Sequence, residues 1–149
     1  MTGDDDAACW REWRELRAIE ALKARYFRLL DTKQWDAWRA LFTDDFEGHV
    51  EGPHPDIHFA SADEMVETNR KVLADAPTAH HGHTPEITLT GPDTAEGIWA
   101  MVDVVTLGDG FTGYGHYHET YRKVDGSWKI AKLRLTRTLV VPGVKQREA

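Results

Sequence analysis

The sequence predicts an α+β fold in which helices pack on one face of a curved, largely antiparallel sheet. Apolar residues in the first third recur at helical spacing, whereas the second half holds four long segments with the period of β-strands. Turn residues separate these segments, and Asp125-Gly126 is the strongest hairpin signal in the chain. Helices followed by a run of strands are typical of an α+β domain.

The composition is that of one globular domain. The chain has 149 residues, of which 41% are hydrophobic and 29% charged, and this is enough to bury a core. A net charge of -7 without a basic stripe argues against nucleic acid as a partner. The single cysteine, Cys9, excludes an internal disulfide. There is no apolar run of membrane-spanning length and no signal-peptide pattern, so we expect a cytoplasmic protein without membrane contact.

The first helix follows a short acidic segment. Residues 1–8 predict a disordered tail, with a single domain over 9–149. From about Cys9 to Leu30, steps of three and four predict one helix. Asp31 and Thr32 can end that helix and cap a second one. The expected apolar positions are Trp13, Leu16, Ile19, Leu22, Tyr26, Leu29 and Leu30 in the first helix, and Trp35, Trp38, Leu41 and Phe42 in the second.

The middle of the chain predicts a short strand over 46–50, a turn over 52–55 and a third helix. Ser61 and Glu64 form a capping box, and the helix should end near Ala74. The four long strands are expected at about 79–90, 94–107, 111–124 and 127–141. In the last of them Ile130 is out of phase with Leu133, which predicts a bulge near Ala131 or Lys132.

Two charged residues occupy positions that the strand period assigns to the core. Both faces of the strand around Asp103 are apolar, which predicts a central strand with a buried carboxylate. Arg137 shares a face with Leu133, Leu135 and Leu139. Because an unpaired buried charge costs several kcal/mol, roughly, each charge needs a partner or a function. Polar groups that converge on an interior indicate a pocket that does chemistry.

The strand period leaves the histidines ambiguous. Ile87 is in phase with His81 rather than His80, so periodicity alone favours His81 as the inward residue, although Pro85 or a bulge can reset the phase. In the strand expected at 111–124, His116 and His118 share a face with Tyr114. The other face carries Tyr117, Glu119 and Tyr121. The sequence does not say which of these faces points inward.

Each candidate residue also has a purely structural interpretation. Asp31 can be only a helix cap, Tyr26 only a core aromatic, and Asp103 with Arg137 only a structural ion pair. His80, His81 and His83 with His116 and His118 invite a metal hypothesis, but the glutamate expected of a cupin is missing, and we expect no metal and no cofactor. Cys9 stands at a frayed helix start, and no Gly-x-Ser-x-Gly motif supports nucleophilic catalysis.

The order of these motifs resembles the SnoaL-like proteins of the superfamily of nuclear transport factor 2 and ketosteroid isomerase. The resemblance covers about residues 10–140, and is strongest to the branch with scytalone dehydratase, bile-acid 7α-dehydratase and hexachlorocyclohexane dehydrochlorinase. It implies a cone-shaped α+β barrel. It rests on Leu-Leu-Asp31-Thr-Lys-Gln-Trp35, Ala-His80-His81-Gly-His83, Ala-Glu-Gly-Ile-Trp99-Ala-Met-Val-Asp103, Gly115-His-Tyr-His-Glu-Thr-Tyr121 and Asp-Gly-Ser-Trp128-Lys-Ile with Arg137.

The resemblance also implies roles for individual residues. The family's catalytic His–Asp pair matches His80, with His81 as the fallback, and Asp31. Tyr26, five residues before the aspartate, matches a catalytic tyrosine of the bile-acid enzyme. The residues expected to contact substrate are Asp103, Arg137, His81, Trp99 and His116. Two departures from scytalone dehydratase are Leu30, where that enzyme has tyrosine, and Val-Val-Thr-Leu107, which lacks its second histidine.

These residues predict a cofactor-independent lyase that eliminates water or another group from a hydrophobic, cyclic, steroid- or polyketide-like molecule. His80 would be the base, Asp31 its orienting partner and Tyr26 a proton donor. An isomerase or polyketide cyclase with the same pocket is the first alternative, and a non-catalytic small-molecule binder is the second. The resemblance also implies a homo-oligomer, a trimer or a dimer, which would cover apolar residues on the open face of the sheet.

Overall fold

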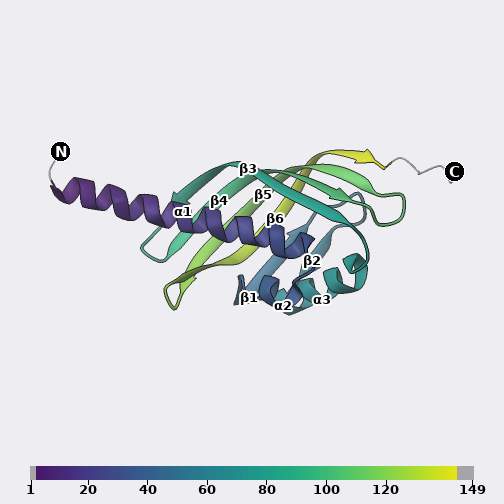
Figure 1. Ribbon diagram of the computed structural model, residues 1–149, viewed down its shortest axis with the longest axis horizontal. Coiled ribbons are helices and arrows are strands. Elements are labelled where there is room, and N and C mark those ends of the chain that lie inside the picture. Colours follow the sequence, from purple (N-terminus) through teal and green to yellow (C-terminus); the bar gives the residue numbers. More distant parts are fainter. Residues whose placement is uncertain (1–2, 144–149) are drawn as a thin grey trace.

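The computed structural model describes residues 3–143 and confirms the α+β prediction (Figure 1). The sheet order is β2-β1-β6-β5-β4-β3, with β1 parallel to β6 and all other neighbours antiparallel. The sheet curls beside α1 without closing into a complete barrel. The elements are α1 (Gly3–Asp31), α2 (Trp35–Arg39), β1 (Phe42–Val50), β2 (Ile57–Phe59), α3 (Ala62–Leu73), β3 (Thr78–Leu89), β4 (Thr94–Val105), β5 (Phe111–Val124) and β6 (Ser127–Pro142).

Helix α1 lies along the sheet, and its N-terminal turns extend beyond the sheet edge (Figure 1). Trp10 and Trp13 on these turns are 63% and 52% exposed, so the predicted stripe is buried only from Ile19 onward. Residues 3–8 are helical rather than disordered, and Ala7 and Ala8 are strong helix formers. The first two residues of the predicted tail lie outside the described part of the chain.

Helix α1 ends at Asp31 as predicted, but the cap of α2 differs from the prediction. The N-cap of α2 is Gln34, which makes no side-chain cap hydrogen bond, so Asp31 and Thr32 do not cap this helix. The carboxylate of Asp31 instead bonds to strand β3. Phe42 begins β1 rather than continuing α2, because its backbone pairs with Ile130 of β6. The short strand β2 is an element that the sequence did not predict.

Helix α3 begins and ends where the sequence predicts. The Ser61 hydroxyl accepts a hydrogen bond from the Glu64 N–H at 3.2 Å. The Glu64 carboxylate reaches back to the N–H of Ala60 at 2.8 Å, which completes a capping box shifted by one residue. The helix ends at Leu73, with Ala74 as its C-cap. All four long strands are confirmed to within about two residues at either end, the usual spread of such boundaries.

We call the face of the sheet that packs against α1 its inner face. Bulges in the long strands determine which side chains point to this inner face. The register of β3 against β4 shifts between His83 and Glu86, where Thr84 has a φ of 40°. The predicted bulge at Ala131 is confirmed, because Tyr121 pairs with Ile130 and Thr120 with Lys132. A further bulge at Thr138 rotates Leu139 outward. Leu139 is 55% exposed, so it does not share the face of Leu133 and Leu135 as predicted.

The core lies between the inner face and the helices. On the opposite, outer face of β4, Ile98 and Val104 are 37% and 38% exposed, so the prediction that this strand is buried on both faces is wrong for the single chain. Among the described helices, none has the length and apolar character that a membrane crossing requires. The buried apolar residues of the inner layer include Ile19, Leu22, Phe42, Phe46, Met65, Trp99, Tyr121, Ile130, Leu133 and Leu135.

Candidate active site

A cavity of about 220 Å³ lies between the inner face of the sheet and the three helices. The polar side chains of its lining are Tyr26, His54, Thr68, Asn69, His80, Asp103, Tyr117 and Arg137. The rest of its wall is largely apolar, as is typical of pockets for small organic molecules. The apolar lining residues include Leu30, Trp38, Val50, Ile57, Phe59, Met65, Val72, Leu73, Val105, Leu107, Phe111, Leu133 and Leu135.

His80 and Asp31 form a hydrogen-bonded pair at one side of the cavity. The His80 ring nitrogen Nδ1 lies 2.7 Å from Asp31 Oδ1, and the His80 backbone N–H donates to Asp31 Oδ2 at 2.8 Å. His80 is buried, and Asp31 stands at the last residue of α1. Because an ionised carboxylate only accepts hydrogen bonds, the imidazole donates from Nδ1 and its Nε2 is free to act as a base.

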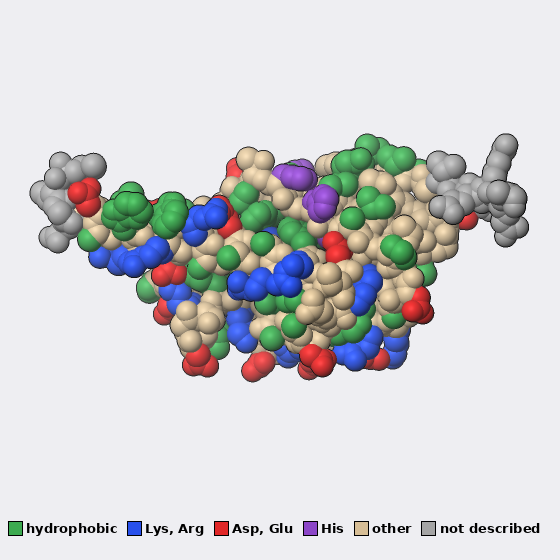
Figure 2. All heavy atoms as spheres, in the orientation of Figure 1, with side chains coloured by type: hydrophobic (Ala, Val, Ile, Leu, Met, Phe, Trp, Pro, Cys, Tyr) green, Lys and Arg blue, Asp and Glu red, His purple; other side chains and the backbone are tan. Residues whose placement is uncertain are grey.

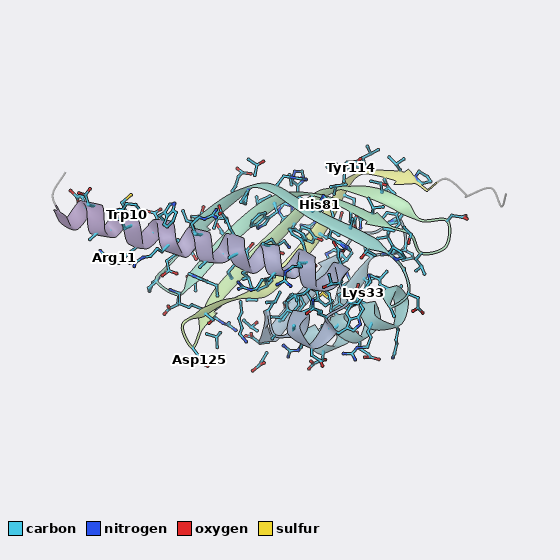
Figure 3. The ribbon with its side chains drawn as sticks, viewed as in Figure 1. Trp10, Arg11, Lys33, His81, Tyr114 and Asp125 are labelled. Carbon is cyan, nitrogen blue, oxygen red and sulfur yellow. The ribbon has the colours of Figure 1, made fainter. Side chains whose placement is uncertain are left out.

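The surroundings of Asp31 keep its carboxyl ionised. Partial burial acts to raise the pKa of Asp31, but the hydrogen bonds from the His80 ring and backbone outweigh it and hold that pKa below its ordinary value. The Thr78 hydroxyl also donates to Asp31, at 2.9 Å, and in turn accepts from the Lys33 ammonium at 2.8 Å. Lys33 lies just beyond the C-terminal end of α1, as Figure 3 shows.

Asp103 and Arg137 form the second polar wall of the cavity. Both guanidinium nitrogens Nη1 and Nη2 donate to the Asp103 carboxylate at 2.8 Å, and Nε donates to the Glu51 carbonyl at 2.9 Å. Both side chains are buried, at 8% exposure for Arg137 and 4% for Asp103. The sequence analysis required a partner or a function for each charge, and the structure shows that the two charges are each other's partner. The remaining donor capacity of Arg137 is small, so the pair acts mainly as a fixed dipole beside the cavity.

Tyr26 and Tyr117 contribute two phenol groups to the lining. Their rings lie 5.8 Å apart at 75°, and the Lys23 ammonium sits 3.9 Å from the Tyr26 ring centre and 3.6 Å from that of Tyr117. Burial raises the pKa of both phenols well above the ordinary value, so both are neutral proton donors. Burial also lowers the pKa of Lys23 to about 8, against the attraction of Glu119, with which Lys23 forms a fully buried ion pair.

Three residues predicted near the substrate lie away from the cavity. His81 is exposed on the outer face, where Figure 3 marks it, because the bulge after His83 turns its neighbour His80 inward. His116 is also on the outer face, opposite to Tyr117 along β5. Trp99 faces inward, but its indole N–H donates to the Tyr121 hydroxyl at 2.8 Å, and it does not line the cavity.

The sequence interpretation missed Tyr117 and three other polar lining residues, His54, Thr68 and Asn69, as well as Lys23, whose ammonium lies 3.6 Å from the Tyr117 ring centre. Tyr117 was assigned only to one of two possible faces, and the structure places it inward. Lys23 lies on the same helical face as Ile19 and Tyr26. A charged residue within an apolar helical stripe could have indicated from the sequence that Lys23 is buried. Among the described residues, no group of three or more histidine, cysteine or acidic side chains is arranged to hold a metal ion.

Comparison with known proteins shows the family. Residues 11–134 match the model of the SnoaL-like domain, so the chain belongs to the SnoaL-like family, as the sequence resemblance predicted. A curated relative, a probable cyclase of Gibberella zeae designated FGR4, is 27% identical over 128 residues, which are 77% of this chain and 85% of the relative.

Solved structures have the same fold. A structure from Novosphingobium aromaticivorans, named as a candidate scytalone dehydratase, has a TM-score of 0.78 at 23% identity and covers 93% of this chain and 97% of its own. A type 2 hexachlorocyclohexane dehydrochlorinase, LinA, has a TM-score of 0.79 at 20% identity, with 93% and 95% covered. The family and its named relatives support a small-molecule-converting enzyme.

Proposed function

We propose that this protein is a cofactor-independent lyase that eliminates water, or another leaving group, from a small hydrophobic cyclic molecule. The observation that carries the proposal is the His80–Asp31 hydrogen bond of 2.7 Å at the wall of a largely apolar cavity. A histidine oriented by a carboxylate is an arrangement that general-base catalysis uses repeatedly. A plain binding pocket has no need of it.

The proposed step starts at a carbon beside a substrate carbonyl. His80 Nε2 takes the proton from this carbon, and the C–H electron pair forms the new double bond while the bond to the β-oxygen breaks. The departing oxygen takes a proton from the Tyr26 hydroxyl, and the proton on His80 returns to Tyr26 through the product water. Asp31 stabilises the imidazolium, and the Asp103–Arg137 pair fixes the orientation of the substrate.

The cavity narrows the expected substrate class. Its volume of about 220 Å³ is below the roughly 300–1,000 Å³ of most pockets for drug-sized ligands. We therefore favour a substrate of one or two rings over the four-ring steroid that the sequence resemblance allowed. The aromatic and aliphatic walls suit a flat or cyclic hydrocarbon frame.

An isomerase or cyclase is the second candidate, and the probable cyclase among the relatives favours it. Isomerisation and cyclisation would use the same proton abstraction by His80 as elimination does, but both retain the mass of the substrate. Mass spectrometry of the product therefore separates the two candidates, because elimination loses the mass of water.

The test is a screen of β-hydroxy ketones that contain one or two rings. Elimination of water converts each of them to a conjugated enone, whose ultraviolet absorbance measures the rate. We expect His80→Ala to lower the rate by about 10²–10⁴-fold. His81→Ala is the matched control: it changes the adjacent histidine, which is exposed on the outer face, and should keep wild-type activity. Equal activity of both variants would show that His80 is not the base.

We also propose that the protein forms a homo-oligomer through the outer face of the sheet. Ile98, Val104, Tyr114 and Val141 are each 37% to 46% exposed on β4, β5 and β6. Hydrophobic side chains gather over this part of the molecule in Figure 2. Exposed apolar residues that share one face of a sheet can mark an interaction site. Analytical ultracentrifugation distinguishes a trimer or dimer from a monomer, and a monomer at all concentrations would refute this proposal.

A further inference from the structure

The surroundings of Tyr26 make this residue reluctant to give up its proton. Burial, followed by the charge of the Glu119 carboxylate, raises the pKa of Tyr26 well above its ordinary value. The residue is 4% exposed, and a phenolate at so buried a position is costly unless a hydrogen-bond donor stabilises it. The elimination proposed above therefore requires a donor that is directed at the Tyr26 oxygen.

Tyr117 stands beside Tyr26 in the wall of the same cavity. It is 2% exposed and lies on the inner face of β5, and the centres of the two rings are 5.8 Å apart at an interplanar angle of 75°. The buried Lys23 ammonium contacts both rings, 3.9 Å from the centre of Tyr26 and 3.6 Å from that of Tyr117. The Phe27 ring packs on Tyr117 at a centre distance of 5.9 Å. These contacts hold the Tyr117 ring next to Tyr26.

The hydroxyl groups of the two tyrosines are hydrogen-bonded to each other. Burial raises the pKa of both phenols, whereas this hydrogen bond acts to lower the pKa of Tyr26 and to raise that of Tyr117. A hydrogen bond stabilises the ionised form of its acceptor and the neutral form of its donor, so Tyr117 donates and Tyr26 accepts. The proton of the Tyr26 hydroxyl is thereby left for a ligand.

We propose that Tyr117 is a positioning residue that acts through Tyr26. Its hydroxyl donates to the Tyr26 oxygen, and this hydrogen bond strengthens as Tyr26 passes its proton to the departing oxygen and becomes a phenolate. Tyr117 keeps its own proton throughout, and the charge on Tyr26 disappears when the proton held by His80 reaches it. The inference rests on the proposed function, because it concerns the leaving-group step of that elimination.

The test compares two leaving groups on one ring frame. A β-hydroxy ketone needs a proton on its departing oxygen, whereas the corresponding β-chloro ketone releases chloride, which leaves as an anion without a proton. Both substrates give the same conjugated enone, so one absorbance assay measures kcat for both after the uncatalysed rate is subtracted. A group that assists protonation of the leaving group affects only the hydroxy ketone, whereas general damage to the site affects both substrates.

We expect Tyr117→Phe to lower kcat for the hydroxy ketone by about tenfold, as loss of one hydrogen bond to a charged group does, and to leave kcat for the chloro ketone unchanged. Tyr26→Phe should show the same selectivity with a larger loss. A variant with both changes should be as slow as Tyr26→Phe alone, because Tyr117 has nothing to act on once the Tyr26 hydroxyl is absent.

Tyr121→Phe is the matched control. It removes another buried hydroxyl of β5, one that donates to Glu119 and accepts from Trp99, and it should keep the wild-type ratio of the two rates. Equal losses with both ketones in Tyr117→Phe would show a merely structural role. Losses that multiply in the double variant would show that Tyr117 does not act through Tyr26. Either result overturns the inference and leaves the proposed elimination standing.

Two further outcomes reach beyond Tyr117. If Tyr26→Phe slows both substrates alike, the role of Tyr26 as proton donor is wrong, and the role of Tyr117 is wrong with it. If wild type converts neither ketone, the proposed function and the role of Tyr117 are both refuted.

Discussion

Asp103 and Arg137 meet above Gly113, across a strand that neither of them belongs to. Asp103 on β4 pairs directly with Gly113 on β5, and Arg137 reaches the same position from β6. A Cβ atom on Gly113 would collide with Arg137 Nη1 and Asp103 Oδ1. Because Gly113 has no side chain, it leaves the space in which the bidentate ion pair forms.

We predict that Gly113→Ala disrupts this ion pair. The added methyl group overpacks the site, and separating two buried charges that satisfy each other adds to the cost, so we expect a loss of about 3 kcal/mol or more in the free energy of unfolding, measured by urea denaturation. Gly91→Ala is the control, because its new Cβ meets only the end of the Thr94 side chain. Similar losses in both variants would contradict the space-filling argument.

We predict that Asp31→Asn lowers both activity and stability at neutral pH. The pKa of Asp31 is lower in the folded protein than its ordinary value, so its stabilising contribution is present above that ordinary value, about 4. It is lost as the pH falls through the lowered pKa. The stability difference between wild type and variant should therefore shrink below about pH 4, in urea titrations at several pH values. A difference that does not change with pH would show that the carboxylate charge is not involved.

We predict that a single change at Lys23 destabilises the protein more than a double change at Lys23 and Glu119. Lys23→Met leaves the Glu119 carboxylate buried without its cation and should cost about 3–5 kcal/mol. Lys23→Met combined with Glu119→Gln removes both charges, and the substituted amide oxygen can still accept from the Tyr121 hydroxyl, as Glu119 does at 2.5 Å. The double variant should recover much of the lost stability in thermal or urea unfolding. A double variant as unstable as the single one would refute the pairing argument.

We predict that Tyr26→Phe lowers the elimination rate by about 10²-fold while the protein remains folded. The change removes the hydroxyl that the mechanism uses as proton donor and keeps the ring that packs on Trp38 and Tyr117. Tyr121→Phe is a matched control, because its hydroxyl lies in the buried network of Trp99 and Glu119 rather than in the cavity. Tyr121→Phe should lower stability more than activity. Steady-state rates and unfolding midpoints of both variants check this.

Much of the fold follows from local patterns. Three features depend on residues that are close in sequence, so local sequence patterns predict them: the order of helices and strands, the hairpin at Asp125-Gly126 and the capping box at Ser61. Asp103 and Arg137 were also identifiable as partners, because a charge within an apolar strand face must be compensated wherever it lies.

The orientation of the site was decided only by the tertiary structure. A single extra residue in a strand exchanges its two faces, and the register between strands determines where that residue lies. The bulge after His83 turns His80 rather than His81 toward Asp31, and the bulge at Thr138 turns Leu139 away from the core. Lys23 and Glu119 are 96 residues apart, and only the packing of α1 on the sheet brings them together. Periodicity indicates which residues share a face between bulges, whereas long-range pairing determines where the bulges lie and which face meets the cavity.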